Sequence, residues 1–126
     1  MYGLIIKREW LDLILSGKKT LEIRGSDTSH QNEVIYLLES GSHRVRGTCV
    51  IESVHPISCS DWNEERNLHH VSISYGQLLQ RCKKPYAWRL KDVTDFGKKE
   101  IYYDHPKGAV IWVKDVEKRI KGGKLK

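Results

Sequence analysis

The apolar spacing of the chain changes at Gly17, and this change constrains the fold more than any other feature of the sequence. Over residues 9–16 apolar side chains recur at spacings that give a short helix a broad apolar face. Glycine is the residue type that most often ends a helix. Over residues 20–24 apolar and polar residues alternate, which is typical of a half-buried strand. The pattern therefore predicts a helix that turns directly into a strand. The polar face of that strand carries Thr20, Glu22 and Arg24.

The rest of the chain alternates strand patterns with turn-rich segments. A helical turn capped by Ser58, Ser60 or Asp61 is predicted, and Ser74 with Gln77 forms a capping box for a second helix. The last strand pattern is apolar on both faces, so we expect a central strand that the rest of a barrel encloses. This order favours an α+β fold, a small mixed β-barrel with two flanking helices. In addition to the strand at residues 20–24, strands are predicted at residues 3–7, 33–39, 44–54 and 86–93, and the central strand at residues 109–113.

The chain has 126 residues, which suits one domain and is too short for two independent cores. We expect that domain over residues 1–114, followed by a basic tail over residues 115–126 that frays from Lys118 onward. Six basic and two acidic residues give residues 114–126 a charge of +4, out of a total of +6. Any affinity for a polyanion therefore depends on a local cluster or on the tail, which either adds phosphate contacts or is only solvated.

Cysteines and apolar runs indicate the compartment. Cys49, Cys59 and Cys82 form neither an even disulfide set nor a CxxC pair. No uninterrupted apolar stretch approaches the length that is needed to span a bilayer. The first residues also lack the long apolar run behind a basic end that is typical of an export signal. We expect an intracellular, cytoplasmic protein, or a nuclear one in a eukaryote, with no membrane partner. The six histidines show no zinc spacing with the cysteines, so we expect no metal and no other cofactor.

Three segments together resemble a known family. Residues 10–24 combine a helix that ends in glycine with Lys-Thr and then Glu-x-Arg. Residues 84–88 read Lys-Pro-Tyr-Ala-Trp, and residues 105–113 run from His-Pro-x-Gly into an apolar strand. In combination they resemble the ASCH domain, a branch of the PUA-like superfamily, and in particular its small stand-alone bacterial members. The resemblance covers roughly residues 3–114 and leaves out the basic tail.

The resemblance implies a cleft beside the first helix and the second strand that binds RNA or a modified nucleotide. Lys19 and Arg24 would contact a phosphate or carbonyl oxygen, while Glu22 orients them or accepts a hydrogen bond from a base or ribose. Nearby aromatic side chains offer faces on which bases stack. We therefore predict a module that binds RNA or DNA, as a single strand or a modified nucleotide. The predicted ligand-binding residues are Trp10, Lys19, Thr20, Glu22, Arg24, Tyr86 and Trp88.

Three alternatives stand beside this prediction, and one of them is a protein-interaction adaptor that acts through the basic tail. The family includes N4-acetylcytidine amidohydrolases, so the resemblance also implies a hydrolase of an acylated nucleoside, or of RNA. Lys19 matches their catalytic lysine, whereas Glu22 replaces their threonine and residues 69–72 lack the carboxylate of their loop. In an enzyme, Lys19 and Glu22 would supply the acid–base chemistry, but the substitution favours binding. The third alternative is that Lys19, Glu22 and Arg24 form only a surface ion pair.

Overall fold

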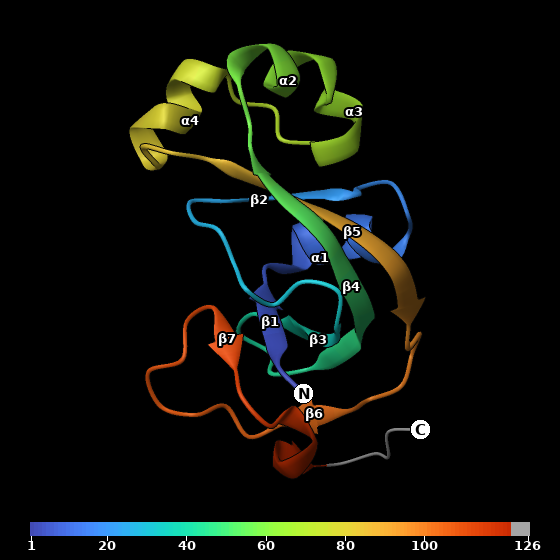
Figure 1. The fold of residues 1–126 in the computed structure, drawn as a ribbon. Coiled ribbons are helices and arrows are strands. Elements are labelled where there is room, and N and C mark those ends of the chain that lie inside the picture. The colour runs from blue at the N-terminus through green and yellow to red at the C-terminus, as the bar shows by residue number, and fades with distance from the viewer. Residues whose placement is uncertain (122–126) are drawn as a thin grey trace.

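The fold is a curled six-stranded sheet with helices at one end and along one side, seen in a computed structural model that describes residues 1–121 (Figure 1). The order of strands in the sheet is β2-β5-β4-β3-β1-β7, and β6 pairs separately with β8. The strands are β1 (Gly3–Ile6), β2 (Leu21–Arg24), β3 (Val34–Glu39), β4 (Val45–Pro56), β5 (Tyr86–Asp95), β6 (Tyr102–Tyr103), β7 (Trp112–Val113) and β8 (Ile120–Lys121). The helices are α1 (Arg8–Leu15), α2 (Cys59–Glu64), α3 (Arg66–His69), α4 (Tyr75–Arg81) and a 3₁₀-helix at Val116–Arg119.

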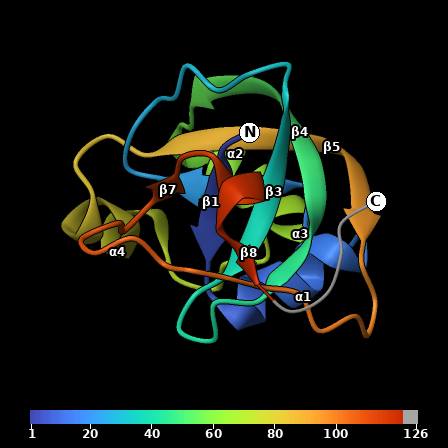
Figure 2. The same ribbon diagram turned by 90° about the horizontal axis from the view of Figure 1, so that it is seen from below.

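The sheet is a half-barrel, because β2 and β7 remain as edges. Its neighbouring strands are antiparallel except for β1 and β3, which run parallel. The register of β4 shifts against both β3 and β5, and such bulges bend strands and increase their twist. Viewed from below, β1, β3, β4 and β5 follow an arc (Figure 2). The predicted α+β class and PUA-like barrel are confirmed in this open form.

The junction between α1 and β2 has the structure that the sequence predicts. The N–H of Gly17 donates to the carbonyl of Ile14, and the N–H of Lys18 donates to the carbonyl of Leu13. This pair of bonds is a Schellman motif, which satisfies carbonyl groups at the end of a helix. Gly17 has a φ of 84°, a conformation that costs other residues more than glycine. The motif reverses the chain so that Lys19 lies between the end of α1 and the start of β2.

The three short helices α2, α3 and α4 lie between β4 and β5 and form one end of the molecule (Figure 1). They pack around Trp62, which is fully buried and whose indole N–H donates to the carbonyl of Ile73 at 2.9 Å. A capping box begins α4 at Ser74, as predicted, and of the three candidate caps for the earlier helical turn it is Ser58 that caps α2, in a capping box with Asp61. Residues 1–121 form four α-helices rather than the predicted two, because the segment after Pro56 makes two additional short helices. Within that range no helix is long and apolar enough to cross a membrane.

The cap of α4 supports a first testable prediction. We expect Ser74→Ala to lower the free energy of unfolding by about 1 kcal/mol, because the Ser74 hydroxyl accepts from the N–H of Gln77 at 3.1 Å. Urea unfolding measures the change. Ser72→Ala alters an exposed serine two residues earlier and should change the free energy by less than about 0.5 kcal/mol. Equal effects of the two substitutions would contradict this role of the cap.

The segment before β7 departs from the sequence-based prediction of a central strand over residues 109–113. Only Trp112 and Val113 pair with β1, and they do so at the edge of the sheet. Val110 and Ile111 are 77% and 41% exposed. A turn in which the N–H of Ala109 donates to the carbonyl of Pro106 occupies the residues before them. The prediction is therefore wrong, because the turn and the exposed residues after it leave only a two-residue edge strand, beyond which the carbonyl of Ile111 accepts one more hydrogen bond, from the N–H of Ile5.

The start of the basic tail is ordered. Val116 is fully buried in an apolar cluster with Val113 and Tyr103, and β8 pairs with β6. The N-terminal ammonium group also lies 2.8 Å from the carboxylate of Glu117. The predicted fraying is thus wrong for residues 118–121, while residues 122–126 lie outside the described residues. The domain boundary after residue 114 stays a prediction.

Candidate functional site

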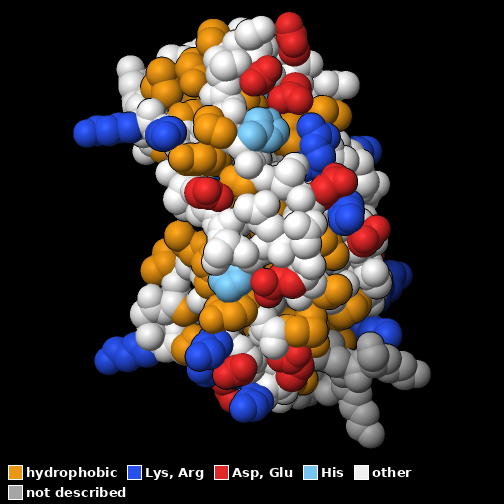
Figure 3. Space-filling view, viewed as in Figure 1, with side chains coloured by type: hydrophobic (Ala, Val, Ile, Leu, Met, Phe, Trp, Pro, Cys, Tyr) orange, Lys and Arg blue, Asp and Glu red, His pale blue; other side chains and the backbone are white. Residues whose placement is uncertain are grey.

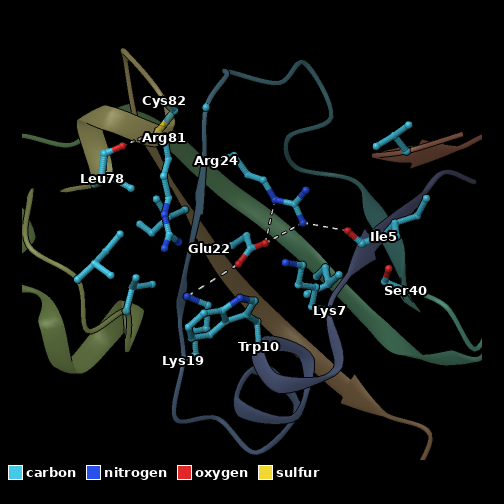
Figure 4. A pocket seen from close by; sticks show the side chains of 16 residues that line it. Ile5, Lys7, Trp10, Lys19, Glu22, Arg24, Ser40, Leu78, Arg81 and Cys82 are labelled. Atoms are coloured by element: carbon cyan, nitrogen blue, oxygen red, sulfur yellow. Dashed lines mark hydrogen bonds and ion pairs between the residues drawn. The ribbon is translucent and has the colours of Figure 1, made fainter.

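A cleft of about 450 Å³ opens where β1, β2, α1 and α4 meet. This volume lies within the range of about 300–1,000 Å³ that is usual for small-molecule sites. The outline of the molecule is indented on the side of α4, β2 and β7, and Lys and Arg side chains project above and below that indentation (Figure 3). Figure 4 shows side chains from all four elements pointing into the cleft. The residues that carry charge in its lining are Lys7, Lys19, Glu22, Arg24 and Arg81.

Lys19 is a buried lysine at the inner end of the cleft, with only 2% of its surface exposed. Its Nζ donates to the carbonyl of His69 at 2.5 Å and lies 3.8 Å from Oε1 of Glu22. The same atom lies 5.0 Å from the centre of the Trp10 ring, within range of a cation–π interaction. Burial lowers the pKa of Lys19 from 10.5 to about 8, although Glu22 opposes the change; Arg24 adds to it. Lys19 can therefore release its proton closer to neutral pH than an exposed lysine can.

The buried and hydrogen-bonded imidazole ring of His69 holds the backbone carbonyl of the same residue in place. The imidazole is fully buried and stacks on Trp62, with centroids 3.9 Å apart. Its Nδ1 accepts from the N–H of Val71 at 2.9 Å, so Nε2 carries the hydrogen and donates to the carbonyl of Trp62 at 2.8 Å. Burial lowers the pKa of His69, which keeps the ring neutral. The loop of residues 69–72 thus presents a carbonyl oxygen to Lys19, in the region where the amidohydrolases would hold a carboxylate.

Glu22 lies between two cations. Its Oε2 accepts from Nε of Arg24 at 2.8 Å and lies 2.8 Å from Nη2 in an ion pair, while its Oε1 faces Lys19. Glu22 is 4% exposed, so the alternative of a surface ion pair does not describe this cluster. Nη2 of Arg24 also donates to the carbonyl of Ile5 at 3.0 Å, which links β2 to β1 across the cleft (Figure 4). Lys19, Glu22 and Arg24 therefore form one connected group, and the guanidinium of Arg24 remains partly exposed.

Three predicted ligand-binding residues do not line the cleft. Thr20 lies before β2, and its N–H and carbonyl bond to Leu68 and Leu90. Trp88 is buried in the core with its indole N–H on the carbonyl of Ser26, and its ring lies 5.7 Å from the guanidinium of Arg24. Tyr86 packs partly buried against the same core. Of the predicted aromatic residues, Trp10 is the one that lines the cleft.

Two cations in the lining carried no sequence-based prediction. Lys7 follows β1 and Arg81 ends α4; both are exposed, and neither forms an ion pair within residues 1–121. Arg81 lies three residues after Leu78, which also lines the cleft, so helical periodicity could have indicated it once the helix was placed. Nothing in the sequence indicates Lys7, because the curl of the sheet brings β1 opposite β2.

The cleft therefore has a positive lining, with four Lys and Arg side chains against one carboxylate. Such a surface favours anionic ligands, and guanidinium groups suit phosphate oxygens in particular. Among the described residues, no group of three or more His, Cys, Asp and Glu side chains could hold a metal ion.

Comparisons with known proteins give the family. No curated protein sequence matches the chain. The crystal structure of the ASCH protein from Zymomonas mobilis is similar over 75% of this chain and 68% of that chain, with 20% identity and a TM-score of 0.59. Crystal structures of two mutants of that protein give TM-scores of 0.60 at the same identity, with 75% of this chain covered and 70% and 69% of theirs. At this identity the likeness shows the fold. The family model of the ASCH domain matches residues 4–111, so the chain belongs to the ASCH domain family, which is generally associated with RNA binding or hydrolase activity.

Proposed function

We propose that this protein is a nucleic-acid binding module whose cleft takes RNA or a modified nucleotide. The observation that carries the proposal is the positive lining around a single buried carboxylate, in a cleft large enough for a nucleotide. Cations attract the phosphates, whereas a carboxylate is an acceptor that phosphate oxygens cannot satisfy. The combination suits a ligand with phosphate oxygens and hydrogen-bond donors together, as a nucleotide has.

The residues divide into three roles. Lys7 and Arg81 are exposed at the mouth and contact phosphates, which gives affinity without sequence preference. Glu22 accepts from a base or ribose donor, while Lys19 and Arg24 contact a phosphate or carbonyl oxygen of the ligand, Arg24 through its exposed side. Trp10 supplies a partly exposed ring on which a base stacks.

The proposal predicts that Lys19→Ala and Arg24→Ala weaken the binding of single-stranded RNA by roughly 10- to 100-fold each, because each removes a charge-assisted contact of about 1.5–3 kcal/mol. Fluorescence anisotropy with a labelled RNA oligonucleotide at several salt concentrations measures the effect. Arg81→Ala, at an exposed position, should in addition lower the slope of log affinity against log salt by about 1.

A matched control for charge is Lys98→Ala, which removes an exposed lysine between β5 and β6 that does not line the cleft. It should leave both the affinity and the salt slope close to those of the parent protein. If Lys19→Ala, Arg24→Ala and Arg81→Ala behave like Lys98→Ala, RNA does not bind in this cleft.

A hydrolase is the second candidate, and the lowered pKa of Lys19 is the observation that favours it. A lysine with a pKa near 8 exchanges protons readily at neutral pH, as a general acid or base must. The test is incubation of the protein with N4-acetylcytidine and, separately, with labelled RNA. Turnover that disappears in both Lys19→Ala and Glu22→Gln supports the hydrolase. Binding of RNA without any turnover supports the module.

A further inference from the structure

A second, smaller pocket of about 210 Å³ adjoins the cleft at the end of β1. Ile5, Ser40 and Val110 line both hollows, so the two share a wall. Sites for complete small-molecule ligands usually exceed about 300 Å³. The smaller pocket is therefore suited to part of a ligand whose remainder occupies the cleft.

The smaller pocket has a wall of aromatic rings held in a fixed orientation. Nε2 of His105 donates to the carbonyl of Ala109 at 2.9 Å, and because a carbonyl only accepts, Nδ1 is the acceptor for the hydroxyl of Tyr103 at 2.9 Å. Both ring nitrogens of His105 are thus engaged. The ring of His43 stacks on that of His105, with centroids 4.8 Å apart and planes 9° from parallel. A flat group that enters this pocket meets rings that are already in place, which lowers the entropic cost of binding.

The wall that the two pockets share suits the backbone of a nucleic acid. Ser40 and Lys7 lie close to Ile5 at this side of the cleft (Figure 4), and both are exposed. A hydroxyl and an ammonium group are common partners of phosphate oxygens. Val110 exposes 77% of its surface there, although it is apolar. A ligand that passes from one pocket to the other would cover it and remove that apolar surface from water.

We infer that the smaller pocket binds the base of a second nucleotide, so that the ligand of this protein is at least a dinucleotide of single-stranded RNA. The inference rests on the proposed function of the cleft and extends it. The first nucleotide occupies the cleft, the linking phosphate crosses the shared wall, and the second base stacks beside His43. Both ring nitrogens of His105 and the hydroxyl of Tyr103 are already engaged with each other or with the backbone, so these rings offer the base stacking surfaces rather than free polar groups.

The test compares four ligands by calorimetric titration: cytidine monophosphate, the dinucleotide CpC, and two CpC analogues that each lack one base. We expect CpC to bind about 5- to 150-fold more tightly than the monophosphate, which is the range that stacking of one base on an aromatic side chain provides. Removal of either base should weaken the binding, because each base occupies its own pocket.

Two variants assign the effect to the smaller pocket. His43→Asn removes the ring and keeps a residue type that tolerates the left-handed backbone of this position, where φ is 61°. Ala109→Leu fills the pocket from a residue that does not line the cleft. Each should abolish the advantage of CpC over the monophosphate and leave the affinity for the monophosphate unchanged. Lys98→Ala should retain the full advantage.

The outcomes separate this inference from the proposed function. If CpC and the monophosphate bind equally well, or if both variants retain the advantage of CpC, the second subsite is wrong and the cleft stands. If an analogue without one base binds as tightly as CpC, the gain comes from the additional ribose and the subsite is again wrong. If none of the four ligands binds, the proposed function fails together with the inference.

Discussion

Glu22→Ala is expected to lower the free energy of unfolding by about 3–5 kcal/mol at neutral pH, because removal of one member of a buried ion pair leaves an uncompensated charge. The charge left behind is Lys19, which is 2% exposed and lies 3.8 Å from Glu22. Arg24 loses its carboxylate partner as well, but its guanidinium is partly exposed and water can replace part of that contact. The loss is a large fraction of the roughly 5–15 kcal/mol that stabilises a typical domain.

Urea unfolding followed by the fluorescence of the four tryptophans measures this change. Glu52→Ala is the matched control, since Glu52 is an exposed glutamate on β4, and we expect it to shift the free energy by less than about 0.5 kcal/mol. The double variant with Lys19→Met and Glu22→Ala should lose less than Glu22→Ala alone, because the stranded charge is gone. A loss below about 1 kcal/mol in Glu22→Ala would indicate an ordinary surface ion pair.

The second large effect depends on pH. Between pH 8 and pH 10.5 the free energy of unfolding should rise in the parent protein relative to Lys19→Met, by up to about 3 kcal/mol. In the folded state Lys19 releases its proton near its lowered pKa of about 8, whereas in the unfolded chain it holds the proton until about 10.5. The unfolded state therefore binds more protons in this interval, and stability increases with pH wherever that is so. Below pH 8 Lys19 is protonated in both the folded and the unfolded state. The burial of its charge then lowers the free energy of unfolding by its full amount.

Unfolding of the two proteins at a series of pH values gives the difference directly. Burial raises the pKa of Tyr36 and Tyr103, so those residues lower the stability as the pH rises beyond about 10. Their contribution is common to both proteins and cancels in the difference. Parallel stability curves for the parent and Lys19→Met would show that Lys19 keeps the pKa of an exposed lysine.

Local patterns in the sequence predict the elements that local interactions determine. The change of apolar spacing at Gly17 predicts α1, its Schellman turn and β2, and the capping residues Ser58 and Ser74 predict the starts of two helices. The same reasoning predicts that Lys19, Glu22 and Arg24 lie together, because they follow one another on a short stretch of chain. These features need no knowledge of what packs against them.

Features that depend on contacts distant in sequence could not be predicted in this way. The prediction for residues 109–113 failed because apolar content alone cannot distinguish a central strand from an edge that lines a cleft. Lys7 and Arg81 meet at the cleft through the curl of the sheet and the placement of α4. The carbonyl of His69 has no side-chain signature at all, since any residue type carries one. Trp88 is buried in the core and does not line the cleft, and alternation along a strand does not show which of its two faces meets the core.

The contact from Arg24 to Ile5 has a consequence for how this cleft can change. In the sheet, three strands separate β2 from β1, so no backbone hydrogen bond joins these two strands, and the guanidinium of Arg24 spans the distance between them. The guanidinium that is proposed to contact the ligand thus also connects two strands of the half-barrel. A ligand that binds Arg24 competes with its hydrogen bond to Ile5. A substitution of Arg24 that is chosen to change the ligand specificity will therefore also change how firmly β2 is held to β1.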